Sequence, residues 1–250
     1  MTEPFAISIV TMNRKLLLSQ VLAAIEATCF EPHIVFVTDN ASTDQTPEML
    51  KGMEKQGKLK AYCLSENMGT SGGRNAQMSD WLGMDSVRID DKVLVTCKGW
   101  LTALKVQSQM YHALLSVCYD PTVIHLNSLA PLLDWVQWDE QGGQGGPLMF
   151  VPGEVSAALG GADEYTDGDE RCVYGFDDCS YIHRAQLLGW RYGFTFRVPH
   201  EILAQASPEG RQRAMRWHPV YQELRRQYEN GDRDLYIDPK QTEGYLSCVS

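Results

Sequence analysis

Short apolar, β-rich runs that alternate with helical patterns constrain the fold of this chain more than any other feature. Such runs occupy residues 6–11, 33–38 and 59–64, and a stretch with helical character follows each of them. Strands that alternate with helices form βαβ units, whose strands lie parallel in one sheet. The sequence therefore predicts one α/β, Rossmann-like domain over residues 1–250, with a mainly parallel central sheet flanked by helices.

Polar clusters follow the expected strands, at residues 11–14, 39–44, 67–75 and 90–92. Ligands of parallel sheets bind at the carboxyl ends of the strands, so these clusters should converge on one crevice of nucleotide-binding type. In the last cluster, Asp90 and Asp91 interrupt an apolar run. An unpaired buried carboxylate is strongly disfavoured, which suggests a divalent metal that holds a diphosphate. The alternative is a solvated turn between two strands.

Composition excludes several classes of protein. Hydrophobic residues make up 44% of the chain and charged residues 22%, as in ordinary soluble domains, and the net charge of -10 argues against a broad nucleic-acid or anionic-membrane surface. The sequence has neither a bilayer-spanning apolar run nor a signal-peptide pattern. Seven scattered cysteines without a CxxC pair predict neither a zinc site nor a disulfide framework, but mostly buried thiols in a reducing cytoplasm.

Together, the four polar clusters resemble the successive motifs of family 2 glycosyltransferases with the GT-A fold. The resemblance covers the first hundred residues in order and spacing, and continues more loosely through 147–163 and 174–190. It implies a nucleotide-sugar-binding half at about 1–95 and an acceptor-binding, catalytic half at about 96–205. A C-terminal helix and tail would occupy about 206–250.

The resemblance assigns roles in binding the nucleotide sugar, which is expected to be UDP-linked. Thr11 and Asp39 would meet the nucleobase, while Arg14 and Arg74 would lie near ribose or phosphate, where a guanidinium binds oxyanions well. The alternative for Gly72 and Gly73 is a plain tight turn, and for Arg74 it is a surface salt bridge. The implied donor-binding residues are Thr11, Asn13, Arg14, Asp39, Asn67, Gly69, Gly72, Gly73, Arg74, Asp90 and Lys92.

The acidic motif departs from the family pattern at Lys92. The family carries Asp-Asp-Asp or Asp-x-Asp here, with the last acid on the metal, so Asp90 and Asp91 are the metal ligands that the resemblance implies for Mn²⁺ or Mg²⁺. His200 follows a predicted strand and is a candidate third ligand, although a lone histidine is more often structural. Alternatively, Lys92 itself neutralises the diphosphate, which leaves metal dependence open.

A second acidic pair, Asp177 and Asp178, is similar to the family's Glu-Asp motif. In inverting members that motif supplies the general base, which takes a proton from the acceptor hydroxyl. The resemblance assigns this role to Asp178 and an orienting or acceptor-contacting role to Asp177. Capping of the helix that begins here is the alternative, because acids are favoured in a first helical turn.

The acceptor is less well specified by the sequence. Trp135, Trp138 and Gly146 are candidate acceptor-binding residues, although tryptophans more often pack in a core. Amphipathic patterns predict helices over about 100–118 and 208–230. A glycan, a lipid, a protein side chain, a small metabolite or a modified nucleic-acid base all fit as the acceptor.

The sequence thus predicts a cytoplasmic hexosyl- or pentosyltransferase that moves a sugar from a nucleotide sugar to a hydroxyl, with inversion. A nucleotidyltransferase is a second interpretation, but it would need a basic glycine-rich loop that residues 11–14 do not supply. A third is a non-catalytic module that binds nucleotide sugars or carbohydrates and has lost its chemistry at Lys92.

Overall fold

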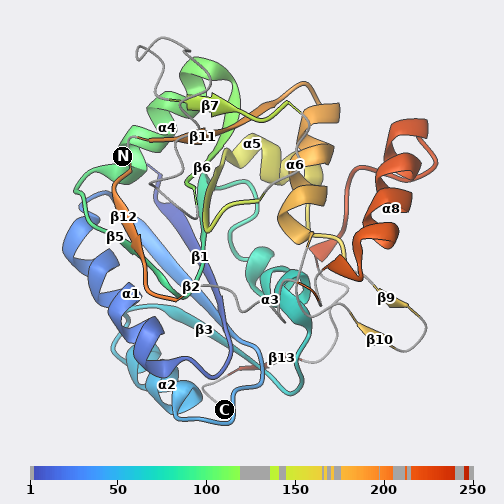
Figure 1. Cartoon of the computed structure of the whole chain (residues 1–250). Coiled ribbons are helices and arrows are strands. Elements are labelled where there is room, and N and C mark those ends of the chain that lie inside the picture. The colour runs from blue at the N-terminus through green and yellow to red at the C-terminus, as the bar shows by residue number, and fades with distance from the viewer. Residues whose placement is uncertain are drawn as a thin grey trace.

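The chain folds around one nine-stranded sheet with helices on both faces (Figure 1). This confirms the predicted fold class, a single α/β domain. The computed structural model describes residues 3–118, 136–140, 145–164, 166–167, 170–171, 176–196, 198–204, 212, 215–239 and 245–247.

The first half of the sheet is parallel, as predicted. Its strands lie in the order β3-β2-β1-β4. β1 and β2 pair from Phe5 opposite His33 to Thr11 opposite Asp39, so both strands end at the same level. The strands are β1 (Phe5–Thr11), β2 (His33–Asp39), β3 (Lys60–Leu64) and β4 (Ser86–Ile89).

The second half makes the sheet mixed rather than mainly parallel. Beyond β4 the order is β8-β6-β11-β7, with β8 antiparallel to both β4 and β6, and β13 closes the opposite edge against β3. These strands are β6 (Ala113–Ser116), β7 (Val136–Trp138), β8 (Leu148–Val151), β11 (Arg191–Thr195) and β13 (Tyr245–Ser247). Two small sheets pair β5 (Val93–Val95) with β12 (His200–Ile202) and β9 (Thr166–Asp167) with β10 (Glu170–Arg171).

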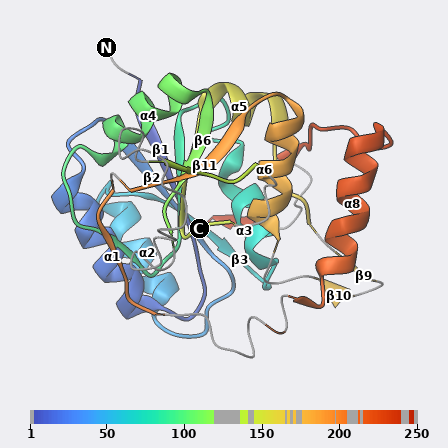
Figure 2. The ribbon, with the colours of Figure 1, turned by 45° about the horizontal axis from the view of Figure 1, so that its top comes forward.

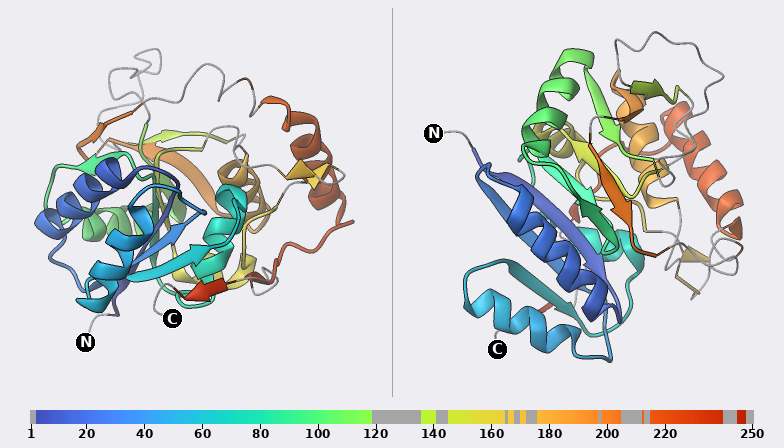
Figure 3. Two further views of the ribbon diagram at one scale, coloured as in Figure 1. Left: turned by 90° about the horizontal axis from the view of Figure 1, so that it is seen from below. Right: turned by 60° about the vertical axis from the view of Figure 1, so that its left-hand side comes forward.

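Helices cover the two faces in sets of three. One face packs on α1, α2 and α4 through residues such as Leu18, Leu50 and Leu104 (Figure 3, right). The other packs on α3, α5 and α6 through Met78 and Tyr181, and α8 stands outside α6 (Figure 2). The helices are α1 (Lys15–Thr28), α2 (Thr46–Lys55), α3 (Gly69–Met78), α4 (Trp100–Tyr111), α5 (Gly153–Leu159), α6 (Asp177–Leu187) and α8 (His218–Asn230).

The helix predicted over 100–118 is wrong in its last part. α4 ends at Tyr111, His112 takes a left-handed conformation with φ 51°, and β6 begins at Ala113. All four residues of β6 are buried between β8 and β11, and such a run cannot be told from a buried helix by its periodicity. Residues 122–126, whose β-rich sequence predicts a further strand, lie outside the described residues.

Cys63 is disulfide-bonded, which departs from the expectation of thiols without a disulfide framework. Cys29, Cys97, Cys118 and Cys179 are free. Among the described helices, none has the length and apolar character needed to cross a membrane.

Candidate functional site

The polar clusters that follow β1 and β4 meet at Asp91. The Thr11 hydroxyl donates a hydrogen bond to Asp91 Oδ2 at 2.8 Å, and an Arg14 guanidinium nitrogen lies 2.8 Å from Asp91 Oδ1. Asp91 is thereby joined to two residues that lie 77 and 80 positions earlier in the sequence. The contact forms because neighbouring parallel strands end at the same edge of the sheet. The predicted convergence of these two clusters is present in the fold.

Three acids of the site each face a cation. Besides the pair of Arg14 with Asp91, Lys92 Nζ lies 3.5 Å from Asp90 Oδ2. Arg74, which α3 carries, lies 3.7 Å from Asp177 at the start of α6. Both predicted acidic pairs are therefore drawn into one cluster of alternating charges.

Asp178 also belongs to this cluster, and its pKa is strongly raised. Burial, and then the neighbouring charge of Asp177, raise its pKa to about 7, while Arg74 and Arg88 act in the opposite direction. Its Oδ1 is buried and has no hydrogen-bond partner among the described residues. Gly145 packs so closely that a Cβ there would lie 2.7 Å from the Asp178 Cβ. A carboxyl group that titrates near neutral pH suits proton transfer.

Strained backbone gathers around this cluster. Of the four described non-glycine residues with positive φ, three lie here: Asn13 after β1, Ala41 after β2 and Phe176 before α6, with φ of 54°, 61° and 60°. Left-handed conformations cost free energy in residues with a Cβ, and they concentrate at functional sites.

Asp39 ends β2 and has an unused acceptor. It is 1% exposed, burial raises its pKa, and its Oδ1 has no hydrogen-bond partner among the described residues. Its other oxygen accepts a 3.3 Å hydrogen bond from the Ser42 N–H. A buried oxygen that accepts no hydrogen bond destabilises the fold, so a ligand that donates an N–H to it would bind favourably.

Several predicted donor-binding residues hold loops together in this structure. The Asn13 side-chain oxygen accepts hydrogen bonds from the backbone N–H groups of Thr43 and Asp44, at 2.7 and 3.3 Å. Asn13 does not cap α1; Arg14 occupies that position. Asn67 accepts from the Gly69 N–H at 2.9 Å, so both residues form the turn that starts α3.

Gly72 and Gly73 lie inside α3 rather than in a loop. A Cβ on Gly72 would lie 2.7 Å from the Met68 Cβ, and one on Gly73 would lie 2.7 Å from a methyl group of Val10. Their small size therefore serves the packing of α3 against β1.

The acidic motif does not fit a divalent ion as it is arranged. Both oxygens of Asp91 are already hydrogen-bonded, one of them to a guanidinium, and Asp90 faces an ammonium. His200 pairs opposite Val95, and its two ring nitrogens each lie 2.9 Å from a carbonyl oxygen, of Val198 and of Cys118, so both nitrogens are occupied by backbone contacts. Across the described residues, no group of three or more His, Cys, Asp or Glu side chains could hold a metal ion.

A family model and solved structures both show likeness to glycosyltransferases. Residues 6–90 match the family model for glycosyl transferase family 2. The structure of mannosyltransferase PcManGT from Pyrobaculum calidifontis, in complex with GDP-Man and Mn²⁺, superposes with a TM-score of 0.63 at 19% identity, over 88% of this chain and 64% of that one. The chain resembles family 2 glycosyltransferases and has the GT-A fold.

Other solved structures share this GT-A fold. S. aureus TarS 1-349 matches with a TM-score of 0.59 at 16% identity, over 88% of this chain and 65% of that one. Its complex with UDP-GlcNAc matches with a TM-score of 0.59 at 17% identity, over 88% and 66% of the two chains. The chain thus spans slightly less than two thirds of each of these structures. No curated protein matches the sequence.

The predicted acceptor residues lie in different places: Gly146 follows Gly145, which packs against Asp178 in the acidic cluster, whereas Trp138 lies in the edge strand β7. Trp138 pairs opposite Gly193 at the sheet edge, with Arg191 3.5 Å from its ring centre and Tyr111 against it edge-on. A Cβ on Gly146 would collide with Ser116, so this glycine serves packing. Trp135 lies outside the described residues.

Two residues of the site were missed by sequence reasoning. Arg88, in the middle of β4, lies with its guanidinium 3.6 Å from the centre of the Tyr181 ring. Asn40 joins β2 to α3 by accepting from the Met68 N–H at 2.8 Å and donating to the Gly69 carbonyl at 2.9 Å. Arg88 could have been noticed as a charge between Val87 and Ile89, but nothing in the sequence indicates Tyr181 as its partner.

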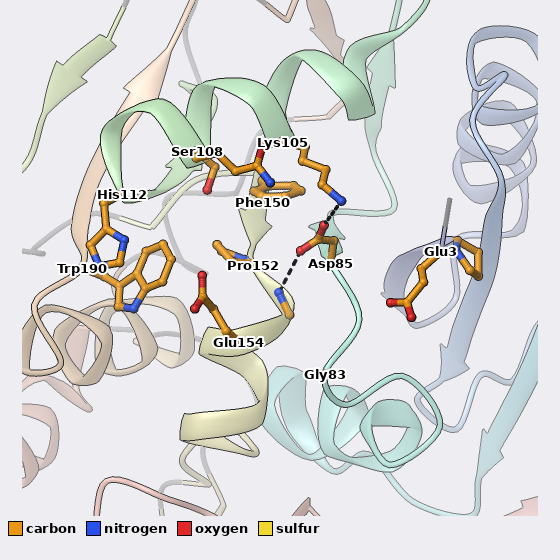
Figure 4. Close-up of a pocket in the computed structure, with 13 residues that line it drawn as sticks. Glu3, Gly83, Asp85, Lys105, Ser108, His112, Phe150, Pro152, Glu154 and Trp190 are labelled. Atoms are coloured by element: carbon orange, nitrogen blue, oxygen red, sulfur yellow. Dashed lines mark hydrogen bonds and ion pairs between the residues drawn. The ribbon is translucent and has the colours of Figure 1, made fainter. Parts of the chain in front are cut away.

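A separate pocket of about 310 Å³ lies at the opposite, amino-terminal edge of the parallel strands (Figure 4). Asp85 forms part of its wall and bonds both Lys105 Nζ at 2.7 Å and the Gly153 N–H at 2.9 Å. His112 and Trp190 stack with ring centres 3.7 Å apart. Asp85 directly precedes β4 and Asp90 directly follows it, so the pocket and the acidic cluster lie at opposite ends of one strand.

Proposed function

We propose that this protein transfers a sugar from a UDP-linked nucleotide sugar to a hydroxyl group, with inversion at the anomeric carbon. One observation carries the proposal: Asp178, a carboxyl group with a pKa of about 7, shares a cluster with the cations that a diphosphate needs. Residues 1–95 bind the donor and residues 96–205 supply the acceptor side, with residues 206–250 as a C-terminal helix and tail.

In the proposed step, Asp178 is the general base. The acceptor oxygen attacks the anomeric carbon as the bond from that carbon to the diphosphate oxygen breaks. The hydroxyl proton passes to Asp178, and the bonding electron pair leaves with the diphosphate. Asp177 is the weaker candidate for the base, because it is buried and paired with Arg74.

Donor recognition draws on the buried acceptor of Asp39 and on the cations of the acidic cluster. Asp39 Oδ1 accepts the N–H of the uracil ring, and Lys92 and Arg14 meet the diphosphate. Lys92 carries the positive charge at the position where family members place a third acid, so the proposal needs no metal ligand there. The comparison structures hold UDP-GlcNAc in one case and GDP-Man with Mn²⁺ in another, which supports a nucleotide-sugar donor.

A thermal-shift panel tests the donor. UDP-, GDP-, CMP- and dTDP-sugars are each added with Mn²⁺, Mg²⁺ or EDTA, because a ligand that binds only the native state raises the melting temperature. The expected result is a shift with UDP-sugars that survives EDTA and is lost in Lys92→Met. A shift that requires Mn²⁺ would overturn the role of Lys92 and assign the diphosphate to a metal.

Asp178→Asn tests the chemistry. We expect it to abolish sugar transfer, measured by release of UDP in the presence of candidate acceptors, while the thermal shift by the donor persists. Asp80→Asn, an exposed change on the surface after α3, is the control and should retain activity. Full transfer by Asp178→Asn would remove this residue from the mechanism. Donor binding without turnover in the native protein would instead favour a non-catalytic module.

A further inference from the structure

Gly145, which precedes β8, lies against the side chain of Asp178. A Cβ added to Gly145 would lie 2.7 Å from the Asp178 Cβ, 2.9 Å from its Oδ2 and 3.3 Å from its carboxyl carbon, and these are the three described atoms nearest to that position. Other heavy atoms do not approach a real Cβ below 3.0 Å. The φ of Gly145 lies outside the left-handed region, so its backbone conformation does not itself require glycine. What excludes a side chain at residue 145 is therefore the proposed base.

The backbone of Gly145 is held in place through the residues that follow it. A Cβ on Gly146 would lie 2.6 Å from the carbonyl oxygen of Val117, so Gly146 packs directly on the chain just after β6. The carbonyl oxygen of Pro147 accepts a 2.8 Å hydrogen bond from the backbone N–H of Asp90, just after β4. β8 itself lies between β4 and β6 in the sheet. The two strands that flank β8 therefore set where Gly145 lies.

The carboxyl group of Asp178 lies between this segment and the first turn of α6. That turn is closed by the N–H of Ser180, which donates to the Phe176 carbonyl at 3.0 Å. Asp178 Oδ1 is buried without a hydrogen-bond partner in the described part of the chain, and Oδ2 is the oxygen that lies beside Gly145. The ionisable groups whose charges act together with that of Asp178 come from α3, α6, β11 and β4 with the residue after it: Arg74, Arg88, Asp90, Asp177, Cys179 and Tyr192.

We propose that Gly145 is a positioning residue for Asp178: its backbone, which the sheet holds in place and which carries no side chain, sets where the carboxylate lies at the start of α6. The consequence for transfer rests on the proposed function, whereas the contact is a property of the free protein. A methyl group on residue 145 would overlap the side chain of Asp178 and displace the carboxylate. The atoms that take the proton from the acceptor would then leave their place beside the donor.

Carbon-13 NMR of aspartate carboxyl groups measures the displacement without any substrate. Asp178→Asn identifies the resonance of interest. A carboxylate that leaves an enclosed place regains water, so Gly145→Ala should move the titration midpoint of Asp178 downward by about one pH unit or more. Gly193→Ala is the matched control, because its Cβ would also lie 2.7 Å from another side chain, that of Val136. It should lower stability without moving the midpoint. An unmoved or raised midpoint in Gly145→Ala would overturn the proposal.

A double-mutant cycle covers the case in which Gly145→Ala alone does not fold. Asp178→Gly removes the side chain that the added methyl group would overlap. Gly145→Ala should therefore lower the melting temperature much less in the Asp178→Gly background than in the native one, because the two residues are in contact. If Gly145→Ala alone is unfolded, the double variant should still fold. An equal loss in both backgrounds, or an unfolded double variant, would contradict the inference.

Kinetics then separate this proposal from the proposed function. Gly145→Ala should lower kcat by about 100-fold, as expected when a reacting group is misplaced by about 1 Å, with KM for the donor unchanged. Gly193→Ala should retain the native kcat. A shifted midpoint in a protein that shows no transfer would refute the function and leave the contact standing. Transfer by Gly145→Ala at the native kcat would instead overturn the positioning role and leave the function standing.

Discussion

The ionisation of Asp178 couples the chemistry of the site to the stability of the fold. Its pKa in the folded protein is about 7, above the ordinary carboxyl value, because burial and Asp177 disfavour the charged form. The native state therefore binds this proton more tightly than the unfolded chain does. The contribution of Asp178 to the free energy of unfolding is therefore fully present at low pH, and it is lost as the pH rises toward and through 7.

Asp178→Asn should accordingly stabilise the protein in a pH-dependent way. At pH 8 we expect a higher melting temperature than for the native chain, because the amide avoids the cost of a buried negative charge. At pH 5, where Asp178 is protonated, the difference should largely disappear. Calorimetry at the two pH values measures this, and Asp80→Asn should show no such dependence. An equal effect at both values would contradict the elevated pKa.

Ala41 adds backbone strain at the end of β2, with φ of 61°. Glycine adopts this conformation without the steric cost of a Cβ, so Ala41→Gly should raise the free energy of unfolding by about 0.5 kcal/mol or more. Chemical denaturation measures the change. Ala24→Gly in the interior of α1 is the matched control and should lower stability by about 1 kcal/mol. Destabilisation by Ala41→Gly would show that the strain is offset elsewhere.

At the scale of elements, α3 connects the two halves of the fold. Its first turn is held to the end of β2 by Asn40. Further along, the Asn75 side chain donates to the Ala162 carbonyl at 3.0 Å and accepts from the Ala162 N–H at 2.7 Å, which fastens the segment after α5. Asn75 also donates to Glu164 at 2.9 Å. One buried amide therefore fastens α3 to the segment that follows α5.

Asn75→Ala should lower the free energy of unfolding by about 2 kcal/mol, because it leaves the backbone N–H and C=O of Ala162 unpaired. Urea denaturation measures the loss. Gln56→Ala, at the exposed end of α2, should change stability by less than about 0.5 kcal/mol. A comparable loss in both variants would mean that the Ala162 contacts contribute nothing specific.

At the scale of the whole molecule, Asp163 joins the C-terminal part of the chain to the body. Its carboxylate accepts from the hydroxyls of Tyr228 and Ser180, and it pairs with Arg233 at 3.1 Å and Arg184 at 3.5 Å. α6, α8 and the segment beyond α8 therefore converge on one fully buried carboxylate. Loss of its charge would leave two arginines without their acid.

Asp163→Asn should thus cost about 3 kcal/mol, as expected when one partner of a buried ion pair is removed. The far-UV circular dichroism signal of the protein should be lost at a lower denaturant concentration than in the native protein. Asp232→Asn, an exposed change just after α8, is the control and should have little effect. Stability equal to that of the control would mean that the network is redundant.

The N-terminal half was largely predictable because its signals are local. β1 to β3 and α1 to α2 have clear periodicity, and the topology of parallel strands brought Thr11 and Asp91 together as expected. β6 was not predictable, since a four-residue run buried on both faces has no period that distinguishes it from a helix. Nor was the contact between Arg88 and Tyr181, because only the packing of α6 on the sheet brings these distant residues together.

The left-handed residues Asn13, Ala41 and Phe176 follow β1, follow β2 and precede α6, and Asp178 lies in the first turn of α6. Screening mutant libraries for thermal stability alone would favour substitutions at these positions, because they relieve backbone strain or remove the buried charge of Asp178. Such a screen would select variants that are more stable but lack the Asp178 carboxylate. A screen that scores function alongside melting temperature would instead retain Asp178.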